Sequence, residues 1–249
     1  MLRETTVFGP IFSRRLGSSL GINLLPQNGK ICNFDCVYCE CGWNKDGRGD
    51  TVLPTAADVQ EALEARLKAC KADGTPIDSI TFSGDGEPTL NPEFPAIVDA
   101  TLALRDRYYP AAKVSVLSNA TRCGKPGVFE ALQKVDNAIL KLDAPTDAQA
   151  ALVNRPVGSY HVAEIVEQLK RFEGRFVLQT MFLRGPGWES ARWVEGWMDL
   201  VREVKPREIM VYTIDRETPM KGLQKYTAEQ MRALVQPLIQ EGYSIQIKG

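Results

Sequence analysis

Short apolar segments alternate along this chain with longer segments in which apolar residues recur every three or four positions. The short segments predict β-strands at 20–24, 79–82, 113–117, 138–142, 176–181, 208–212 and 244–247. The longer segments predict amphipathic helices, because positions three and four residues apart share one face of a helix. An alternation of this kind is typical of a parallel sheet with right-handed crossovers.

The starts of three helices are indicated by residues that favour the first helical turn. Thr55 with Asp58, and Thr227 with Gln230, have the spacing of capping boxes, in which each side chain bonds the other residue's backbone N–H. Pro92 stands where a proline is tolerated as the first helical residue. The tryptophans and methionines of the helical segments are expected to be core residues.

The strand–helix alternation predicts an α/β fold. Six strand–helix units make a partial (βα)6 barrel, and a doubly wound open sheet is the alternative. Both arrangements gather ligands at the C-terminal ends of the strands. No linker or low-complexity tract interrupts the alternation, so one domain is predicted over 1–249.

Charge and hydropathy narrow the function classes. The 249 residues include 30 basic and 31 acidic side chains, and the formal net charge is −1. This balance argues against general nucleic-acid binding. No apolar run approaches the roughly 20 residues that span a bilayer, and 1–10 lacks the apolar region of a signal peptide. We therefore expect a cytoplasmic protein with no membrane association.

The cysteines are unevenly distributed. Two are isolated and are expected to be buried or incidental, namely Cys70 and Cys123. The other four lie within ten positions, which is unlike the spread pairs of a disulfide scaffold. Clustered thiols in a reducing compartment more often bind metal, and the clustered set is Cys32, Cys36, Cys39 and Cys41.

Three of these cysteines predict an iron–sulfur site with an open position. A cluster of four irons normally takes four thiolates, so Cys32, Cys36 and Cys39 leave one iron open to a substrate. Two alternatives stay open: a structural zinc site with Cys41 as the fourth ligand, and a ferredoxin-like four-cysteine cluster. The single residue between Cys39 and Cys41 fits the usual zinc spacing poorly.

Polar residues follow several predicted strands at the edge where ligands are expected. The first set is a glycine-rich turn, in which glycines let the backbone approach a ligand closely: Ser83-Gly84-Asp85-Gly86-Glu87-Pro88. The second set comes from three further strands and comprises Ser118, Asn119, Lys141, Asp143 and Gln179. Lys141 and Asp143 share one side of their strand, so a mutual ion pair and contact with a ligand carboxylate are both open.

Taken together, these segments resemble a known superfamily. The spacing of three and then two residues between the cysteines, with Tyr38 before the last one, resembles the radical S-adenosylmethionine (SAM) signature. The turn at 83–88 resembles the Gly-Gly-Glu segment that holds the SAM amino group, with Asp85 in place of the first glycine. Other stretches resemble the small Fe–S oxidoreductase family related to the wyosine-synthase branch: 9–17, 82–89, 141–144, 154–156 and 211–216.

The resemblance implies a partial (βα)6 barrel that holds a [4Fe–4S] cluster on Cys32, Cys36 and Cys39. It implies that SAM binds the open iron and that one electron cleaves its sulfonium bond, giving a 5′-deoxyadenosyl radical that abstracts hydrogen. An external one-electron donor such as flavodoxin or ferredoxin is then needed. The residues implied to bind SAM are Tyr38, Gly84, Asp85, Gly86, Glu87, Ser118, Asn119, Lys141, Asp143 and Gln179.

The resemblance leaves the substrate unidentified. Wyosine synthases need additional N-terminal cysteines for a second cluster, and none precedes Cys32, so wyosine formation is not expected. A glycyl-radical-enzyme activase and an electron carrier without SAM chemistry are the alternatives. Loop arginines favour an anionic substrate or an acidic donor protein, and the candidate residues are Arg155, Asp215 and Arg216, with Arg14, Arg15 and Arg184 in similar loops.

Overall fold

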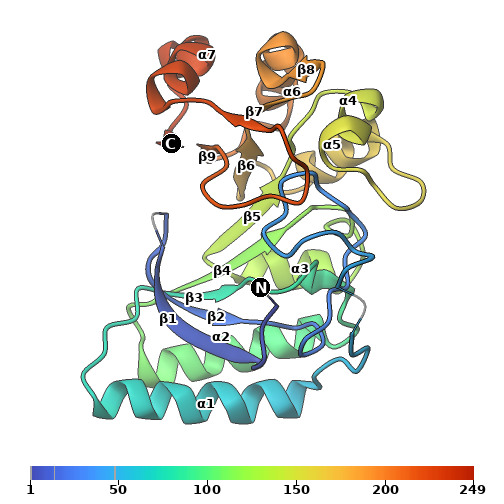
Figure 1. Ribbon diagram of the computed structural model, residues 1–249. Coiled ribbons are helices and arrows are strands. Elements are labelled where there is room, and N and C mark those ends of the chain that lie inside the picture. The colour runs from blue at the N-terminus through green and yellow to red at the C-terminus, as the bar shows by residue number, and fades with distance from the viewer. Residues whose placement is uncertain (1, 14, 48) are drawn as a thin grey trace. The chain divides into compact units, whose positions relative to one another are not determined.

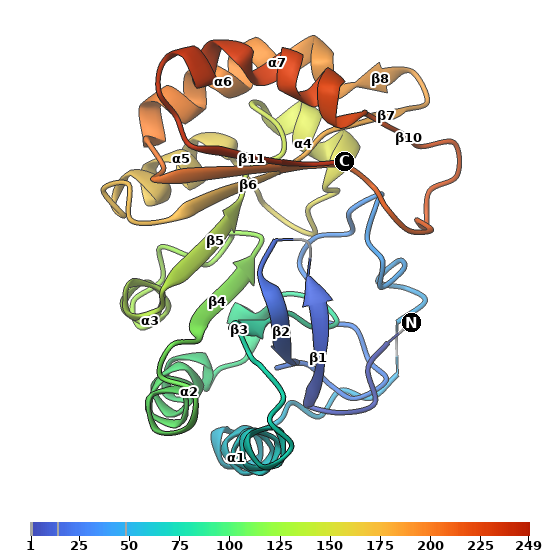
Figure 2. The same cartoon turned by 90° about the vertical axis from the view of Figure 1, so that its left-hand side faces the viewer.

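The computed structural model describes residues 2–13, 15–47 and 49–249 (Figures 1 and 2). Arg14, one of the loop arginines considered above, lies outside the described residues. The chain forms two compact units, which we describe separately. The first comprises Met1–Cys32, Asn44–Ser118 and Arg122–Ala138, and the second comprises Asn33–Trp43, Asn119–Thr121 and Ile139–Gly249. The prediction of one domain stays a prediction.

Four strands of the first unit pair in chain order. They are β1 (Val7–Ser13), β2 (Gly17–Ile22), β3 (Ser79–Phe82) and β4 (Lys113–Ser118). β1 runs antiparallel to β2, whereas β2, β3 and β4 are parallel. The sequence did not predict β1, because most of its residues are only half-buried or exposed and no apolar run marks it.

Two long helices of the first unit pack against each other, α1 (Ala56–Ala72) and α2 (Phe94–Tyr108) (Figure 1). The predicted capping box of Thr55 and Asp58 is present at the start of α1. The predicted start of α2 at Pro92 is wrong by two residues. The Glu93 backbone N–H bonds the side chain of Asn91, and the first helical residue is Phe94. The shorter α3 (Val128–Lys134) and the 3₁₀ turn η1 (Pro88–Leu90) complete the helices of this unit.

The second unit contains a parallel sheet in which residues 139–141 of β5 (Asn137–Lys141) pair with β6 (Val177–Met181). β6 pairs with β9 (Glu208–Tyr212), and β9 pairs with β11 (Ile245–Lys248). With β2, β3 and β4, these four account for all seven predicted strands, with ends shifted by up to three residues. The structure also contains a small antiparallel sheet that the sequence did not predict. Its strands lie in the order β10 (Gln224–Lys225), β7 (Leu183–Gly185) and β8 (Trp188–Glu189).

Four helices and one 3₁₀ turn belong to the second unit. They are α4 (Asp147–Val153), α5 (Val162–Lys170), η2 (Ser190–Trp193), α6 (Val194–Val204) and α7 (Ala228–Gln240). The predicted capping box of Thr227 and Gln230 begins α7. Trp197 of α6 is fully buried, and its indole N–H donates to the Leu142 carbonyl at 3.0 Å, so the expectation of a core tryptophan is confirmed.

None of the helices in the described ranges is both long and apolar enough to cross a membrane.

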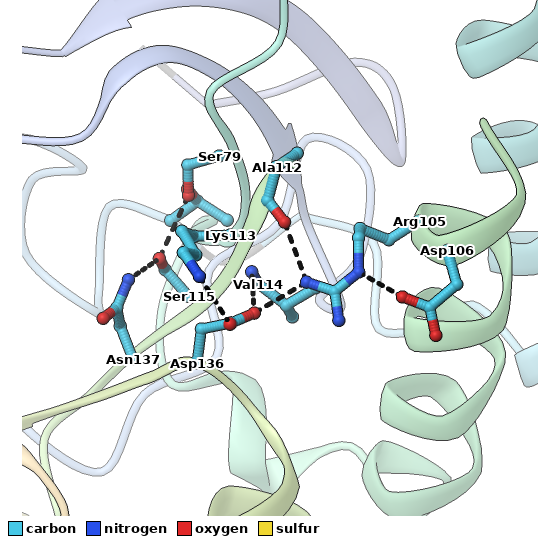
Figure 3. Close-up of polar contacts among 10 residues, drawn as sticks. Ser79, Arg105, Asp106, Ala112, Lys113, Val114, Ser115, Asp136 and Asn137 are labelled. Atoms are coloured by element: carbon cyan, nitrogen blue, oxygen red, sulfur yellow. Dashed lines mark hydrogen bonds and ion pairs between the residues drawn. The ribbon is translucent and has the colours of Figure 1, made fainter. Parts of the chain in front are cut away.

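An acidic side chain anchors the start of β4 in the first unit, as Figure 3 shows. One carboxylate oxygen of Asp136 accepts from the Val114 backbone N–H at 2.9 Å and from Arg105 Nη1 at 2.7 Å. The other oxygen accepts from Lys113 Nζ at 3.3 Å. Partial burial alone raises the pKa of Asp136, but these donors outweigh it and hold the pKa below its usual value.

Replacement of Asp136 by Asn should lower the free energy of unfolding by about 1–3 kcal/mol at pH 7, because charged donors lose their acceptor. The lowered pKa means that the carboxylate stabilises the fold above the unfolded-state pKa of about 3.9, and this contribution is lost as the pH falls through the folded-state pKa. Urea titrations at pH 7 and pH 3 should therefore show a difference between wild type and variant that shrinks in acid. An equal difference at both pH values would contradict the ion-pair account.

Candidate functional site

The cysteine-rich segment crosses from the first unit to the second. Cys32 ends the first stretch of one unit, and Cys36, Cys39 and Cys41 belong to the other. All six cysteines of the chain are thiols. Cys36 is buried, whereas the other three of the segment are half-buried. The two isolated cysteines are buried, as expected.

The backbone of the loop that carries Cys36 is held by the residues that end α4, within the second unit. The Asp35 N–H donates to the carbonyl oxygens of Asn154 and Arg155 at 3.0 and 3.1 Å, and the Val37 N–H donates to that of Val153 at 3.0 Å. The ring of Phe34 packs edge-on against Tyr160, with 5.2 Å between centroids. The segment 153–160 thereby fixes the course of the loop.

A buried group of polar side chains lies beside Cys36 in the second unit. At its centre is Asp143, whose side chain has no exposed surface. Its Oδ2 accepts from the Tyr38 hydroxyl and from Asn154 Nδ2, the latter at 2.6 Å, and its Oδ1 accepts from the Met181 N–H at 2.8 Å. Asn154 Nδ2 also lies 3.5 Å from Cys36 Sγ. We call Tyr38, Lys141, Asp143, Asn154 and Tyr212 the Asp143 network.

Lys141 supplies the positive charge of this network. Its Nζ donates to the hydroxyls of Tyr38 and Tyr212 at 2.8 and 3.2 Å and lies 3.6 Å from Asp143 Oδ2. Of the two interpretations left open by the sequence, the structure contains the ion pair of Lys141 with Asp143. Gln179 is buried and is the Cα partner of Lys141 in the sheet, which places both side chains on one face.

The surroundings fix the protonation of three side chains. Burial raises the pKa of the Cys36 thiol to about 11, although Lys141 opposes this. Burial also raises the pKa of Tyr38, and the negative charge of Asp143 adds to the effect. For Lys141, burial alone lowers the pKa, but Asp143 outweighs it and raises the pKa above its usual value. At neutral pH the site therefore holds a thiol, a phenol and an ammonium group.

The glycine-rich turn lies in the first unit and packs against the residue before Cys32. The Ile31 N–H donates to the Asp85 carbonyl at 3.2 Å, and the Glu87 N–H donates to the Ile31 carbonyl at 3.1 Å. Gly86 has a φ of 141°, and a Cβ at this position would lie 1.9 Å from the Ile31 carbonyl oxygen. Gly86 is thus required for the turn to approach the cysteine segment.

Asp85 of this turn is engaged by a residue that the sequence did not single out. Its carboxylate accepts from both the backbone N–H and the guanidinium of Arg3, each at 2.6 Å, and its side chain is fully buried. Its backbone N–H donates to the side chain of Asn23 at 3.1 Å. Nothing in the sequence pairs Arg3 with Asp85, because they are 82 positions apart.

The structure brings together Glu87 and Ser118, which the sequence predicted from separate strands. Glu87 Oε1 accepts from Ser118 Oγ at 2.8 Å and from Thr89 Oγ1 at 2.6 Å. Asn119, although next to Ser118 in the chain, belongs to the second unit and donates to Asn33 Oδ1 at 2.7 Å. Two of the predicted SAM-binding residues thus share one buried cluster, and the third is bonded to the cysteine loop.

The predicted substrate residues Arg155, Asp215 and Arg216 are exposed residues of the second unit. The Arg155 guanidinium lies over the Trp43 ring, 4.8 Å from its centroid. Arg216 Nη1 forms an ion pair with Glu40 Oε2 at 2.7 Å. Both arginines therefore contact the segment that follows Cys39, although they are 61 positions apart in the chain.

The donor set suits an iron–sulfur cluster by chemistry and spacing. Thiols are the ligands that such clusters take, and three of them lie within eight positions. In the part of the chain that the structure describes, no three His, Cys, Asp or Glu side chains are close enough to hold a metal ion. The cysteine segment therefore fits an iron–sulfur cluster by the type of its ligands and by their spacing in the chain.

Comparison with known proteins decides the family. The Radical SAM superfamily matches residues 29–195, which include the cysteine segment, the glycine-rich turn and the Asp143 network apart from Tyr212. The chain belongs to the radical SAM superfamily. The resemblance noted in the sequence is thereby confirmed. A UPF0026 protein of Helicobacter pylori is 30% identical over 221 residues, which cover 87% of this chain and 68% of that protein.

Solved radical SAM structures share the fold. A radical SAM methyltransferase from Sphaerobacter thermophilus is similar with a TM-score of 0.70 at 16% identity, over 95% of this chain and 67% of that one. TYW1 with a lysine–pyruvate adduct bound has a TM-score of 0.65 at 15% identity, over 92% and 76%. The predicted α/β fold, a partial (βα)6 barrel of the radical SAM type, is confirmed by this likeness.

Replacement of Gly86 by Ala in this radical SAM protein should displace Ile31 and with it the start of the cysteine segment. We expect a lower melting temperature and a loss of more than about 1 kcal/mol in the free energy of unfolding, since the contact is to backbone. Gly74→Ala is the matched control, because Gly74 also has a positive φ, of 68°, but no atom lies within 4 Å of its added Cβ. Equal losses in the two variants would show that the contact with Ile31 is unimportant.

Proposed function

We propose that this radical SAM protein holds a [4Fe–4S] cluster on Cys32, Cys36 and Cys39 and cleaves SAM reductively to start hydrogen abstraction from a substrate. The observation that carries the proposal is the three-thiol loop, spaced by three and then two residues, inside the segment that matches the superfamily. Cys41 is proposed to be dispensable as a ligand.

The cluster, when bound, supplies one electron at an iron that has no cysteine ligand. The chain's own part is to present its thiols. Cys36 is a buried thiol with a raised pKa, so it releases a proton when it becomes a ligand. The backbone bonds from Asp35 and Val37 hold the Cys36 loop in place for this step.

We assign SAM binding to the residues that the resemblance to the superfamily implied, and we take them unit by unit. In the first unit, Glu87 is a buried carboxylate suited to accept hydrogen bonds from the SAM amino group, and Ser118 orients it through the 2.8 Å bond. Gly84 and Gly86 allow the backbone to approach the ligand, and Asp85 stabilises the turn through Arg3. In the second unit the proposed SAM residues are Tyr38, Asn119, Lys141, Asp143 and Gln179.

The reductant is proposed to be an external one-electron donor such as flavodoxin or ferredoxin. Arg155 and Arg216 remain the proposed contacts for an anionic substrate or for an acidic partner, together with Asp215. The stacking of Arg155 on Trp43 supports this role, because it holds an exposed cation beside the cysteine segment.

Removal of any one of Cys32, Cys36 and Cys39, as alanine variants, should abolish stable cluster binding, because the remaining two thiolates hold too few irons. Cys41→Ala should retain a [4Fe–4S] spectrum after anaerobic reconstitution. Iron and sulfide content with absorption spectroscopy, measured without SAM, checks this. Loss of the cluster in the Cys41 variant would identify a fourth protein ligand and favour a closed cluster.

The reaction itself is tested by reducing the reconstituted protein anaerobically with SAM and measuring 5′-deoxyadenosine. Product formation is expected in the wild type, whereas an electron carrier without SAM chemistry would form none. Glu87→Ala should keep the cluster and weaken SAM affinity about 5- to 150-fold, equivalent to roughly 1–3 kcal/mol.

A matched control separates binding by Glu87 from its structural role. Thr89→Val removes the 2.6 Å hydrogen bond to Glu87 Oε1 but keeps the carboxylate, so SAM affinity should change little. If Thr89→Val weakened SAM binding as much as Glu87→Ala did, the carboxylate would act only by holding the turn.

A further inference from the structure

We infer that Asn154 is a positioning residue that sets the reduction potential of the cluster by donating an N–H to the sulfur of Cys36. The inference rests on the proposed function, because it requires the cluster. Asn154 Nδ2 lies 3.5 Å from Cys36 Sγ, and both residues belong to the second unit. The side chain of Asn154 is buried, so water does not compete for this bond.

The backbone of Asn154 is fixed on both sides. The residue caps the C-terminus of α4, where its N–H donates to the Ala150 carbonyl at 2.7 Å. Its own carbonyl accepts from the Asp35 N–H at 3.0 Å, next to Cys36 in the chain. The amide and the cysteine are therefore carried by one hydrogen-bonded piece of backbone, and the 2.6 Å contact of the amide with Asp143 Oδ2 fixes its side chain.

Asp143 determines which end of the amide faces the sulfur. An ionised carboxylate only accepts hydrogen bonds, so the 2.6 Å contact to Asp143 Oδ2 requires the NH₂ group of Asn154, not its oxygen. Asp143 is held in turn by the Met181 N–H and by Tyr38. With one N–H directed to Asp143, the second N–H of the same group is available to Cys36 and to the Tyr38 hydroxyl at 3.4 Å.

A hydrogen bond to a cysteine ligand stabilises the reduced cluster more than the oxidised one, because reduction adds negative charge to the sulfur atoms. The reduction potential is therefore higher with the bond than without it. Two charges act on the same sulfur: the ammonium of Lys141 favours the reduced state, and the carboxylate of Asp143 opposes it. The Asn154 amide is neutral, so its removal changes the hydrogen bond without changing the net charge.

The test is a potentiometric titration of the reconstituted full-length protein, followed by electron paramagnetic resonance of the reduced cluster. Asn154→Leu should keep iron and sulfide content and shift the potential to a more negative value. Asn91→Leu is the matched control: Asn91 is equally buried, but its amide donates to the carbonyls of Leu24 and Pro54, at 3.1 and 2.9 Å. An unshifted potential in Asn154→Leu, or an equal shift in both variants, overturns the inference.

A second measurement covers the case in which Asn154→Leu fails to assemble a cluster. In wild-type protein labelled with ¹⁵N at asparagine, electron-spin-echo spectroscopy of the reduced cluster should show a nitrogen coupling that is lost from the uncharged variant Asn154→Ser, while couplings from other asparagines are common to both. Absence of any such coupling from the wild type, or an identical spectrum for Asn154→Ser, overturns the inference. If the wild type assembles the cluster but forms no 5′-deoxyadenosine, the proposed function is refuted, and the reduction potential still decides the inference about Asn154. If the wild type assembles no cluster, the proposed function and the inference are both overturned.

Discussion

The buried carboxylate of Asp143 is the interaction on which the cysteine-bearing unit depends. A charge without exposed surface is costly unless it is hydrogen-bonded and paired. Here hydrogen bonds come from a backbone N–H, a tyrosine and an asparagine, and an ammonium group lies 3.6 Å away. The three donors lie on β6, on the cysteine loop and at the end of α4, and the ammonium group lies on β5. Four segments of the chain therefore contact one carboxylate beside Cys36, and these contacts orient their side chains.

In the first unit the start of the cysteine segment is held by backbone hydrogen bonds, not by a buried charge. There the approach to Cys32 is made by the glycine-rich turn, and the missing side chain of Gly86 lets two stretches of main chain exchange hydrogen bonds. The two carboxylates of the turn make other contacts. Asp85 forms an ion pair with Arg3, and Glu87 accepts hydrogen bonds from the hydroxyls of Thr89 and Ser118. Side-chain charge governs one half of the cysteine segment, and glycine geometry governs the other.

Much of this could be predicted from the sequence, for identifiable reasons. Buried parallel strands carry closely spaced apolar residues, continuous in β9 and interrupted by serine or threonine in β3 and β4, so these three strands were located closely. β1 was missed because its residues are half-buried or exposed. The cysteines, Glu87, Ser118 and the Lys141–Asp143 pair were singled out as candidates because spacing and strand ends mark them. The stretch 154–156 carried part of the family resemblance, but the contacts of Asn154 with Cys36 and of Arg3 with Asp85 were not predicted. These partners are 118 and 82 positions apart, and no local pattern records such a pairing.

The dependence of the Cys36 loop on the end of α4 has a consequence for biosynthesis. During translation Cys36 leaves the ribosome well before its hydrogen-bonding partner exists, since Asn154 follows it by 118 residues. At about 5–20 residues per second, the delay is roughly 6 to 24 seconds. Throughout that interval the Cys36 loop lacks the backbone partners at 153–155 that later hold it, and its thiol is open to oxygen and to stray metal ions. For the cluster proposed on the three cysteines, delivery after α4 has formed would meet a finished loop, and earlier delivery would meet an unshaped one.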